Sequence, residues 1–590
     1  MFNAVGWQLT LGACWRDVLA KFIALLGAFL AMKVVHFVIK RRHQHQTFKR
    51  MQVPGPKPHL IHGHLYDTRR QAYVKFAHKM HEKYGKNVGV YLGGDPYLLT
   101  KDLDLIQQVF VARSRIFYDR MNFYLNVDPV PDNLICQRGD RWRYMRRLLT
   151  PAFSNQKIRC SQFYLDCQRT VEKFMNQVEA NSKTVLGADS KVHRETIVAD
   201  VYDRMAAVAL DVIVKTAFHM DDVILFDGQL NAEHSLGKRP QCEMACSAER
   251  VDTFLQTAKR ACRLGFNPLV ELIFCFPFLD GPLTFMCNHL YFGSIIRLLF
   301  QRLDHLVRRQ NKPPRSSTED KINDKSKESI GMGENKNGQK NGDGRHKLSS
   351  KQGKRIIDSL IEVLKERKIT KSEFTGNAFV ILFAGFETTA NALTFTLWLL
   401  ARDQRVQKKL RTILREQLAR DGNASAGDTE LELAELATGC QYLEMVINES
   451  LRLYPPVPGL SCRQASTSCQ VGTMNIEKGV NVVPSVFSIH RDKTIWGERA
   501  NEFEPERFEV VDVNQLNSSM FMPFGLGPRN CIGKAAALHE LKILIGRLVQ
   551  NYSIETCDGF TPSKLRLCSP INITITNSEP IGLKFVKINE

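Results

Sequence analysis

The 590-residue chain is 44% hydrophobic and 24% charged, which is ordinary for a globular protein, and its length allows several domains or one large enzyme. Its 15 cysteines contain no C-x-x-C pair, which excludes the common zinc-site patterns and favours reduced thiols in a cytosol-facing protein over a disulfide framework. The formal net charge of +20 favours an acidic protein, an anionic membrane surface or a nucleic acid as partner, and carries no information about the fold.

The first predicted element is a membrane anchor from Val18 to Ile39, an apolar stretch about as long as a bilayer requires. Lys21 lies near one end and can extend its ammonium group to the interface, whereas Lys33 lies deeper and is unusual there. A basic run, residues 41–50, follows and places the rest of the chain in the cytosol by the positive-inside rule. The alternative is a mitochondrial presequence, which is favoured by Asp17 as the single acidic residue of this stretch.

A stiff spacer is predicted directly after the anchor, where residues 53–58 read VPGPKP. Alternating prolines cannot form a helix and keep the chain extended. We therefore divide the sequence into an anchor with a basic linker, residues 1–52, and a globular domain, residues 53–590. Within that domain, residues 312–354 are polar, rich in Gly, Asn and Lys and almost free of apolar residues, which predicts a disordered surface insertion.

Most of the globular domain has the apolar spacing of amphipathic helices, for example at Ile356–Arg367 and Val406–Arg420. Short strands are predicted at Asn87–Thr100, at Gln470–Pro484 and in the C-terminal tail. Residues 377–401 are long and apolar enough to cross a membrane, but they carry a glutamate and two threonines at their centre. Because a carboxylate is costly at mid-bilayer, we predict a buried core helix beside a polar pocket.

The stretch FGLGPRNCIGK, residues 524–534, contains three glycines, an arginine and a cysteine. A dinucleotide-binding loop requires a third glycine where Asn530 stands. A P-loop requires four residues between its glycines and then Lys-Ser/Thr, whereas five residues separate Gly527 from Gly533 and Ala535 follows the lysine. Both phosphate-binding interpretations therefore fail.

A metal-binding cysteine remains as the interpretation of this stretch. Apolar residues recur at helical spacing from residue 537 onward, so Cys531 lies just before a helix N-terminus, whose free N–H groups and positive dipole end favour a thiolate. A free thiol has a pKa near ~8.5, so ligation to the metal would complete its deprotonation. The glycines leave room for a large flat group, and Arg529 is placed to pair with an anionic part of it.

These residues resemble the haem-binding signature of the cytochrome P450 family. Phe524, Gly527, Arg529, Cys531 and Gly533 stand at its conserved positions. In that family the cysteine is the thiolate axial ligand of the haem iron. The resemblance implies a mainly α cytochrome P450 fold, a helical bundle around haem b with small β-sheets, with residues 53–590 as the catalytic domain behind an N-terminal transmembrane anchor.

Other parts of the same family pattern follow in the family's order. Glu449 and Arg452 form its ExxR motif on one helix face, and Arg507 of the stretch FEPERF is similar to the third member of the family's buried Glu–Arg–Arg network. Residues 384–389 resemble its oxygen-activation motif, which implies that Thr388 and Glu387 relay protons to the bound oxygen and that a glycine lets the helix open locally.

The resemblance also assigns residues to the haem. Trp142 and Arg146 resemble the tryptophan and arginine that bind a propionate, and Arg463 stands where a further propionate-binding arginine is usual. The implied haem-binding residues are Trp142, Arg146, Arg463, Phe524, Gly527, Arg529, Cys531 and Gly533. Candidate substrate-pocket walls are the loop Phe117–Ile135, Ala384, Thr388, Val457–Leu460 and the tail near Ile573.

By this resemblance the chain is expected to be a monooxygenase of the endoplasmic reticulum membrane, facing the cytosol and inserting one oxygen atom from O2 into a lipophilic small molecule. Electrons would come from NADPH through the acidic NADPH–cytochrome P450 reductase, which suits the positive charge, with cytochrome b5 as a further candidate and no nucleic-acid partner. A member of the mitochondrial inner membrane would use a ferredoxin instead. The alternative functions are a haem-thiolate isomerase or dehydratase that converts a peroxide without reductase, and a non-enzymatic haem sensor.

Overall fold

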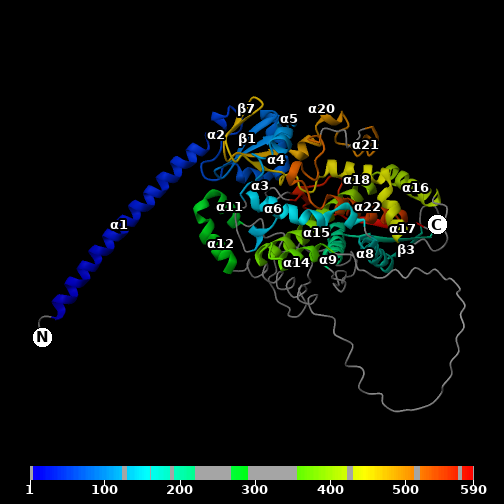
Figure 1. Ribbon diagram of the computed structural model, residues 1–590, viewed down its shortest axis with the longest axis horizontal. Helices are drawn as coiled ribbons and strands as arrows, with labels where there is room; N and C mark the ends of the chain where they lie inside the picture. The colour runs from blue at the N-terminus through cyan, green and yellow to red at the C-terminus, as the bar shows by residue number, and fades with distance from the viewer. Residues whose placement is uncertain are drawn as a thin grey trace, which may run out of the picture.

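Helices dominate the computed structural model, as the sequence predicts, and four small sheets lie among them (Figure 1). The described residues are 4–122, 129–159, 161–186, 192–218, 268–289, 355–420, 430–510, 518–568 and 574–588. The predicted insertion at 312–354 lies outside them. The longer helices are α1 (Ala4–Gln44), α4 (Tyr73–Tyr84), α6 (Gly139–Leu149), α8 (Ser161–Ala180), α9 (Val201–Phe218), α11 (Pro268–Cys275), α12 (Asp280–His289), α14 (Ile356–Lys365), α15 (Lys371–Arg402), α16 (Gln404–Arg420), α17 (Glu430–Gly439), α18 (Gln441–Leu453) and α22 (Lys534–Asn551).

The shorter helices connect these elements. They are α2 (Thr47–Arg50), α3 (Leu65–Gln71), α5 (Leu103–Gln107), η1 (Gln108–Ala112), η2 (Val130–Asp132), η3 (Thr150–Phe153), α7 (Asn155–Ile158), η5 (Pro277–Leu279), α19 (Val486–Ile489), α20 (Lys493–Trp496), α21 (Arg507–Val510) and η6 (Gly527–Arg529). The predicted helices at 356–367 and 406–420 are confirmed as α14 and α16, with shifts of two residues at one end of each.

Helix α15 runs through the middle of the helical body (Figure 1). It begins at Thr370, whose hydroxyl accepts from the N–H of Glu373 at 3.1 Å while the Glu373 carboxylate accepts from the Thr370 N–H at 2.9 Å, a reciprocal cap. Most of its residues are buried, and it packs against α9, α14, α18 and α22. The prediction that this apolar segment is a core helix is therefore confirmed.

The predicted strands are confirmed at all three places. One sheet has the order β1 (Asn87–Leu92), β2 (Asp95–Thr100), β8 (Asn481–Pro484) and β5 (Arg463–Gln464), in which only the β2–β8 pair is parallel. A second has the order β3 (Lys183–Leu186), β4 (Val192–Val198), β12 (Leu583–Lys587) and β9 (Tyr552–Thr556). Two hairpins complete the set, β6 (Cys469–Val471) with β7 (Met474–Ile476) and β10 (Leu567–Cys568) with β11 (Thr576–Asn577).

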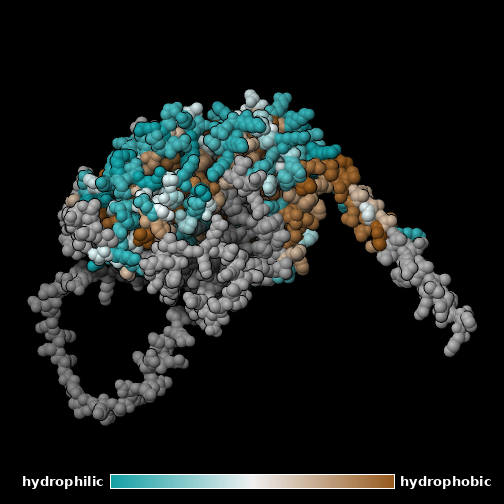
Figure 2. Space-filling model, turned by 180° about the vertical axis from the view of Figure 1, so that it is seen from behind, coloured by the Kyte–Doolittle hydropathy of each residue, from teal (hydrophilic) through white to brown (hydrophobic). Residues whose placement is uncertain are grey.

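Helix α1 projects away from the body, and its described part presents apolar side chains to the surroundings (Figures 1 and 2). It contains the predicted anchor and extends beyond it at both ends. Lys33 lies on this exposed surface, with its ammonium group 5.1 Å from the centre of the Phe29 ring. An exposed apolar helix of this length fits a bilayer-spanning segment.

The junction between anchor and body differs from the predicted spacer. Arg41, at the end of α1, is 2% exposed and donates to the carbonyl of Cys275 in α11, and the Phe37 ring lies 5.6 Å from the Phe276 ring. Phe48 and Met51 are buried in a core cluster with residues of β1 and β2. The carbonyl of Pro54 accepts from a β1 N–H at 2.9 Å. Residues before 53 therefore already pack against the body, and the segment 53–58, which is non-helical as predicted, is tied to the edge strand β1 through the Pro54 carbonyl.

Candidate active site

The cysteine loop is shaped by close contact between two backbone segments. Gly527 in η6 has φ +66°, and a Cβ at this position would lie 1.9 Å from the carbonyl oxygen of Phe110 in η1. Only glycine fits such a position. After η6, the N–H of Cys531 donates to the carbonyl of Phe524 at 2.8 Å, and α22 begins three residues later, as predicted. The loop thereby holds Cys531 at the start of a helix.

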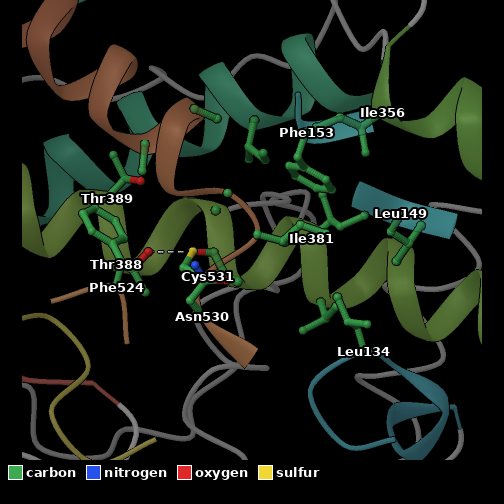
Figure 3. A pocket seen from close by; sticks show the side chains of 18 of the residues that line it. Leu134, Leu149, Phe153, Ile356, Ile381, Thr388, Thr389, Phe524, Asn530 and Cys531 are labelled. Carbon is green, nitrogen blue, oxygen red and sulfur yellow. Dashed lines mark hydrogen bonds between the residues drawn. The ribbon is translucent and has the colours of Figure 1, made fainter. Parts of the chain in front are cut away.

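The Cys531 side chain opens onto a cavity of about 310 Å³ (Figure 3). It lies deep in the protein, and this burial raises the pKa of the Cys531 thiol, although the N–H of Gly533 and the cations of Arg146 and Arg120 act in the opposite direction. The helix N-terminus therefore does not by itself lower the pKa of this thiol below its ordinary value. A Cβ added at Gly533 would meet only the Cys531 sulfur, at 4.0 Å, so there is room beside the sulfur.

Helix α15 forms the wall of the cavity that faces this loop. Ala384, Gly385 and Thr388 line it, and Figure 3 shows Thr388 and Cys531 at the same end. The Thr388 hydroxyl donates to the carbonyl of Ala384 at 2.7 Å. A Cβ on Gly385 would lie 2.8 Å from the side chain of Ile213, so this glycine allows α15 and α9 to approach closely. Helix α15 is continuous here, so the structure shows close packing where the motif implied a local opening.

Glu387 faces a different side of α15 from Thr388. Consecutive helical residues are about 100° apart around the axis. Glu387 is 8% exposed, it accepts from the hydroxyl of Thr574 at 2.8 Å, and it is absent from the cavity lining among the described residues. The structure therefore brings Thr388 into the cavity and holds the neighbouring acid behind the helix.

Cations gather where the cysteine loop meets α6. Trp142 is buried beneath Arg529, whose guanidinium carbon lies 4.1 Å from the centre of a Trp142 ring. Arg529 donates to the carbonyls of Tyr118 at 2.6 Å and Gln137 at 2.7 Å. Arg146 donates to the backbone and side-chain oxygens of Asn530, both at 2.9 Å. These bonds tie α6 and the preceding loop to the cysteine loop.

Arg463 lies on the far side of this group of cations. It is 2% exposed, its guanidinium donates to the carbonyls of Cys462 at 2.8 Å and Leu526 at 3.1 Å, and it stacks on the Phe110 ring. Arg463, Trp142, Arg146 and Arg529 line a second recess of about 690 Å³, which we call the basic recess. Arg463 is absent from the described lining of the Cys531 cavity. Exposed arginines at 115, 143 and 147 complete the basic recess.

The ExxR pair and its partner are brought together in the core. Arg452 and Glu449 are fully buried and form two hydrogen bonds of 2.7 and 2.8 Å, and Arg507 Nε lies 3.5 Å from the same carboxylate. Arg452 also donates to the carbonyl of Ala500 at 2.7 Å. The paired carboxylate offsets the cost of burying both guanidinium groups.

His490 extends this network to the cysteine loop. Its carbonyl accepts from Arg452 at 2.5 Å, and its Nε2 accepts from the N–H of Met522 at 3.0 Å, two residues before Phe524. Burial and the nearby Arg452 lower the pKa of His490 to about 3, so the ring is neutral and Nε2 remains an acceptor. The sequence alone does not single out this residue, because a single histidine in a segment without a motif gives no signal.

Comparison with known proteins identifies the family. The sequence profile of the family described as Cytochrome P450 matches residues 53–585. The chain belongs to the cytochrome P450 family. Cytochrome P450 3A9 of Rattus norvegicus is 28% identical over 92% of this chain and 93% of its own length, and cytochrome P450 3A13 of Mus musculus is 26% identical over the same shares. Cytochrome P450 3A56 of Fundulus heteroclitus is 27% identical over 95% of this chain and 97% of its own length.

The protein is therefore a cytochrome P450 monooxygenase, and its cofactor is haem. The cavity residues fit this group on two observations. There is open room beside the Cys531 sulfur, and several guanidinium groups meet there with one carboxylate, Asp119, 3.6 Å from Arg529. Burial and the neighbouring Arg120 lower the pKa of Arg529 to about 9, so an anion beside these cations would be stabilising. The two propionates of haem supply such anions.

Arg120 is a further cytochrome P450 site residue that the sequence analysis missed. It lines the Cys531 cavity, donates to the carbonyl of Arg529 at 3.2 Å, and its buried Nε has no hydrogen-bond partner among the described residues. Burial lowers its pKa. The available signal was its place inside the predicted wall loop Phe117–Ile135. Of the other predicted walls, Leu134, Ile135, Val457 and Leu460 line the cavity, whereas Ile573 lies outside the described residues.

Proposed function

We propose that this cytochrome P450 inserts one oxygen atom from O2 into a lipophilic substrate, using electrons from NADPH that reach it through NADPH–cytochrome P450 reductase. The observation that carries the proposal is that Cys531 and Thr388 line the same cavity from the cysteine loop and from α15. When bound, haem supplies the iron at which dioxygen is activated. The apolar wall between these residues excludes water and suits an apolar substrate.

The cofactor-binding roles follow from the positions of the side chains. Cys531 would hold the haem iron through its sulfur, and Arg146, Arg529 and Arg120 would supply positive charge to the propionates. Trp142 supports Arg529 from below. Arg463 donates to two carbonyl groups, which hold its guanidinium in the basic recess. We propose that it contributes to haem binding from there through its positive charge.

Proton delivery is proposed to pass through Thr388. At rest its hydroxyl proton is directed to the carbonyl of Ala384, and rotation about χ1 directs the same proton into the cavity. Glu387 is proposed as the source behind it. Because the Glu387 carboxylate accepts from Thr574, the proton reaches Thr388 either after the carboxyl side chain leaves Thr574 or through ordered water.

The membrane and electron-transfer parts of the proposal rest on α1 and on surface charge. We propose insertion of α1 in the endoplasmic reticulum membrane with the body in the cytosol, since basic residues follow the apolar helix. The exposed arginines of the basic recess suit an acidic flavoprotein, with cytochrome b5 as a further donor. The alternative location is the mitochondrial inner membrane, with a ferredoxin as donor.

One experiment separates these functions. The haem-loaded protein is supplied with NADPH and either the flavoprotein reductase or a ferredoxin with its own reductase, and product formation is measured over a panel of lipophilic compounds. Turnover with the flavoprotein supports the proposal. Turnover with the ferredoxin alone would instead assign the protein to the mitochondrial inner membrane. Rapid conversion of hydroperoxides without any reductase would establish the isomerase function. Haem binding with no turnover in any arm would favour the sensor.

A further inference from the structure

The Cys531 cavity has a second end that is polar. On α15 the lining residues extend from Ala392 through Thr388 to Asn377, a helical length of about 22 Å at 1.5 Å per residue. In Figure 3, Ile356 and Leu149 lie on the side of Ile381 away from Thr388 and Cys531. The space is thus elongated, with the cysteine and Thr388 toward one end.

Four polar side chains close the far end, and we call them the polar end. They come from two helices and one helix cap: Lys157 of α7, Gln162 and Asp166 of α8, and Arg355 immediately before α14. Arg355 Nη1 lies 3.1 Å from Asp166 Oδ2, and Gln162 donates to Asp166 Oδ1 at 2.8 Å. Lys157 Nζ lies 3.4 Å from the hydroxyl of Ser359 in α14. Arg355, Asp166 and Gln162 therefore form one connected group, and Lys157 lines the same cavity while it contacts α14.

The hydrogen bonds of this cluster are incomplete. Arg355 is 7% exposed and Asp166 2% exposed, so neither can be solvated from the surface. Arg355 Nη1 and Asp166 Oδ2 contact each other as an ion pair without hydrogen-bond geometry, and Nε of Arg355 has no hydrogen-bond partner among the residues that the structure describes. A buried guanidinium with an unsatisfied donor is costly, and a ligand or water can satisfy it.

The charge of the polar end favours an anionic ligand. Of the described residues that line this end, two are cations, Lys157 and Arg355, and one is an ion-paired carboxylate, Asp166, so the lining has an excess of positive charge; a second carboxylate, Asp358, lies outside the lining and accepts from the Arg355 backbone N–H at 2.8 Å. Glu540 also lines the cavity, and burial raises its pKa well above the ordinary value, which favours the uncharged form of this carboxyl. A planar guanidinium with free N–H groups matches the two oxygens of a carboxylate.

We propose that the polar end binds the carboxylate of a long apolar acid, whose chain lies along the apolar face of α15 toward Thr388. This inference rests on the proposed function and names the substrate class of the same site. Thr388 lies about 16 Å along α15 from Asn377, so a chain held at Arg355 presents its opposite end for oxidation. There a C–H bond becomes C–O–H with one atom of O2, and the second atom leaves as water with two electrons from NADPH and two protons.

Dodecanoate and methyl dodecanoate are the probes, since they share a chain and differ in charge. Binding to the haem-loaded protein is measured by the Soret shift and, independently, by equilibrium dialysis. We expect the acid to bind about tenfold more tightly than the ester, since a hydrogen bond to a charged group is involved. The double variant D166N/R355Q removes both charges together and should abolish this preference.

A matched control is available in α9, where Lys215 and Asp211 form a buried ion pair that is absent from the described lining of the cavity. The variant D211N/K215Q should retain the full preference for the acid. D166N alone frees Arg355 from its internal partner, so dodecanoate should bind more tightly and raise the thermal midpoint more than in the unchanged protein. K157Q should weaken acid binding several-fold, and it tests the proposal even if the double variant fails to load haem.

Three results would overturn the inference: equal binding of acid and ester, a preference that survives in D166N/R355Q, or oxidation next to the carboxylate. The first of these would mean that water satisfies the polar end. Each is distinguishable from failure of the proposed function, which shows as absent turnover with reductase while the binding measurements need no turnover.

Discussion

Replacing Gly527 by alanine should detach the cysteine loop from η1. The alanine Cβ would lie 1.9 Å from the Phe110 carbonyl oxygen, where real contacts stay above 3.0 Å, so the two segments must separate by about 1.1 Å. The positive φ of +66° adds about 1–2 kcal/mol for a residue with a Cβ, and overpacking adds about 1–3 kcal/mol. We expect the free energy of unfolding to fall by about 2–5 kcal/mol. Haem binding should also weaken, because Arg529, a proposed haem-binding residue, lies two residues further on.

Gly559→Ala is the matched control for this prediction. Gly559 has φ +77°, and an added Cβ meets nothing within 4 Å, so only the conformational cost of about 1–2 kcal/mol applies. Changes in the unfolded chain are the same for both substitutions and cancel in the comparison. Urea unfolding is followed by tryptophan fluorescence, and haem retention by the Soret band. Equal urea midpoints and equal haem retention for the two variants would refute the steric argument.

Four further predictions address other parts of the molecule. Cys531→Ser should abolish the red-shifted Soret band of the reduced carbon monoxide complex, and a variant that keeps this band would disprove the ligand assignment. Thr388→Ala should retain haem but lower product formation roughly 10²-fold while NADPH oxidation continues to peroxide, and unchanged coupling would contradict its role. Glu449→Gln should cost about 3–5 kcal/mol in urea unfolding by leaving Arg452 buried without a counterion, so an unchanged midpoint would count against the network. Deleting residues 312–354 should leave the haem spectrum intact, and loss of haem would show that the insertion is structural.

The sequence predicted the features that local spacing encodes. The position of Cys531 before a helix, the shared face of Glu449 and Arg452, and the buried helix around Thr388 all follow from residues within one or two turns of one another. Such short-range patterns can be recognised in the sequence because each depends on one helix or one loop. The order of the motifs then sufficed to place them in one family.

Contacts between segments that are distant in the sequence could not be predicted from it. Thr574 lies 187 residues from Glu387, and Tyr118 lies 411 residues from Arg529, so no local pattern reports either hydrogen bond. The direction of the Glu387 carboxylate, the place of Arg463 in the basic recess and the role of His490 all depend on contacts of this kind. The contact of the proline segment with the body has the same origin, since its hydrogen-bond partner is a strand more than 30 residues away.

The contacts at the junction near Arg41 fix the anchor helix α1 to the body. A helix held only by a flexible tether can tilt in a membrane without turning the domain behind it, but α1 is joined to α11 by the buried Arg41 guanidinium and to the residue after α11 by a contact between the Phe37 and Phe276 rings. A helix adjusts its tilt when the hydrocarbon thickness of the bilayer changes. With α1 inserted in a bilayer as proposed, such a tilt would pass through Arg41 to the body, so the thickness of the host membrane would influence the angle at which the catalytic domain meets the lipid surface.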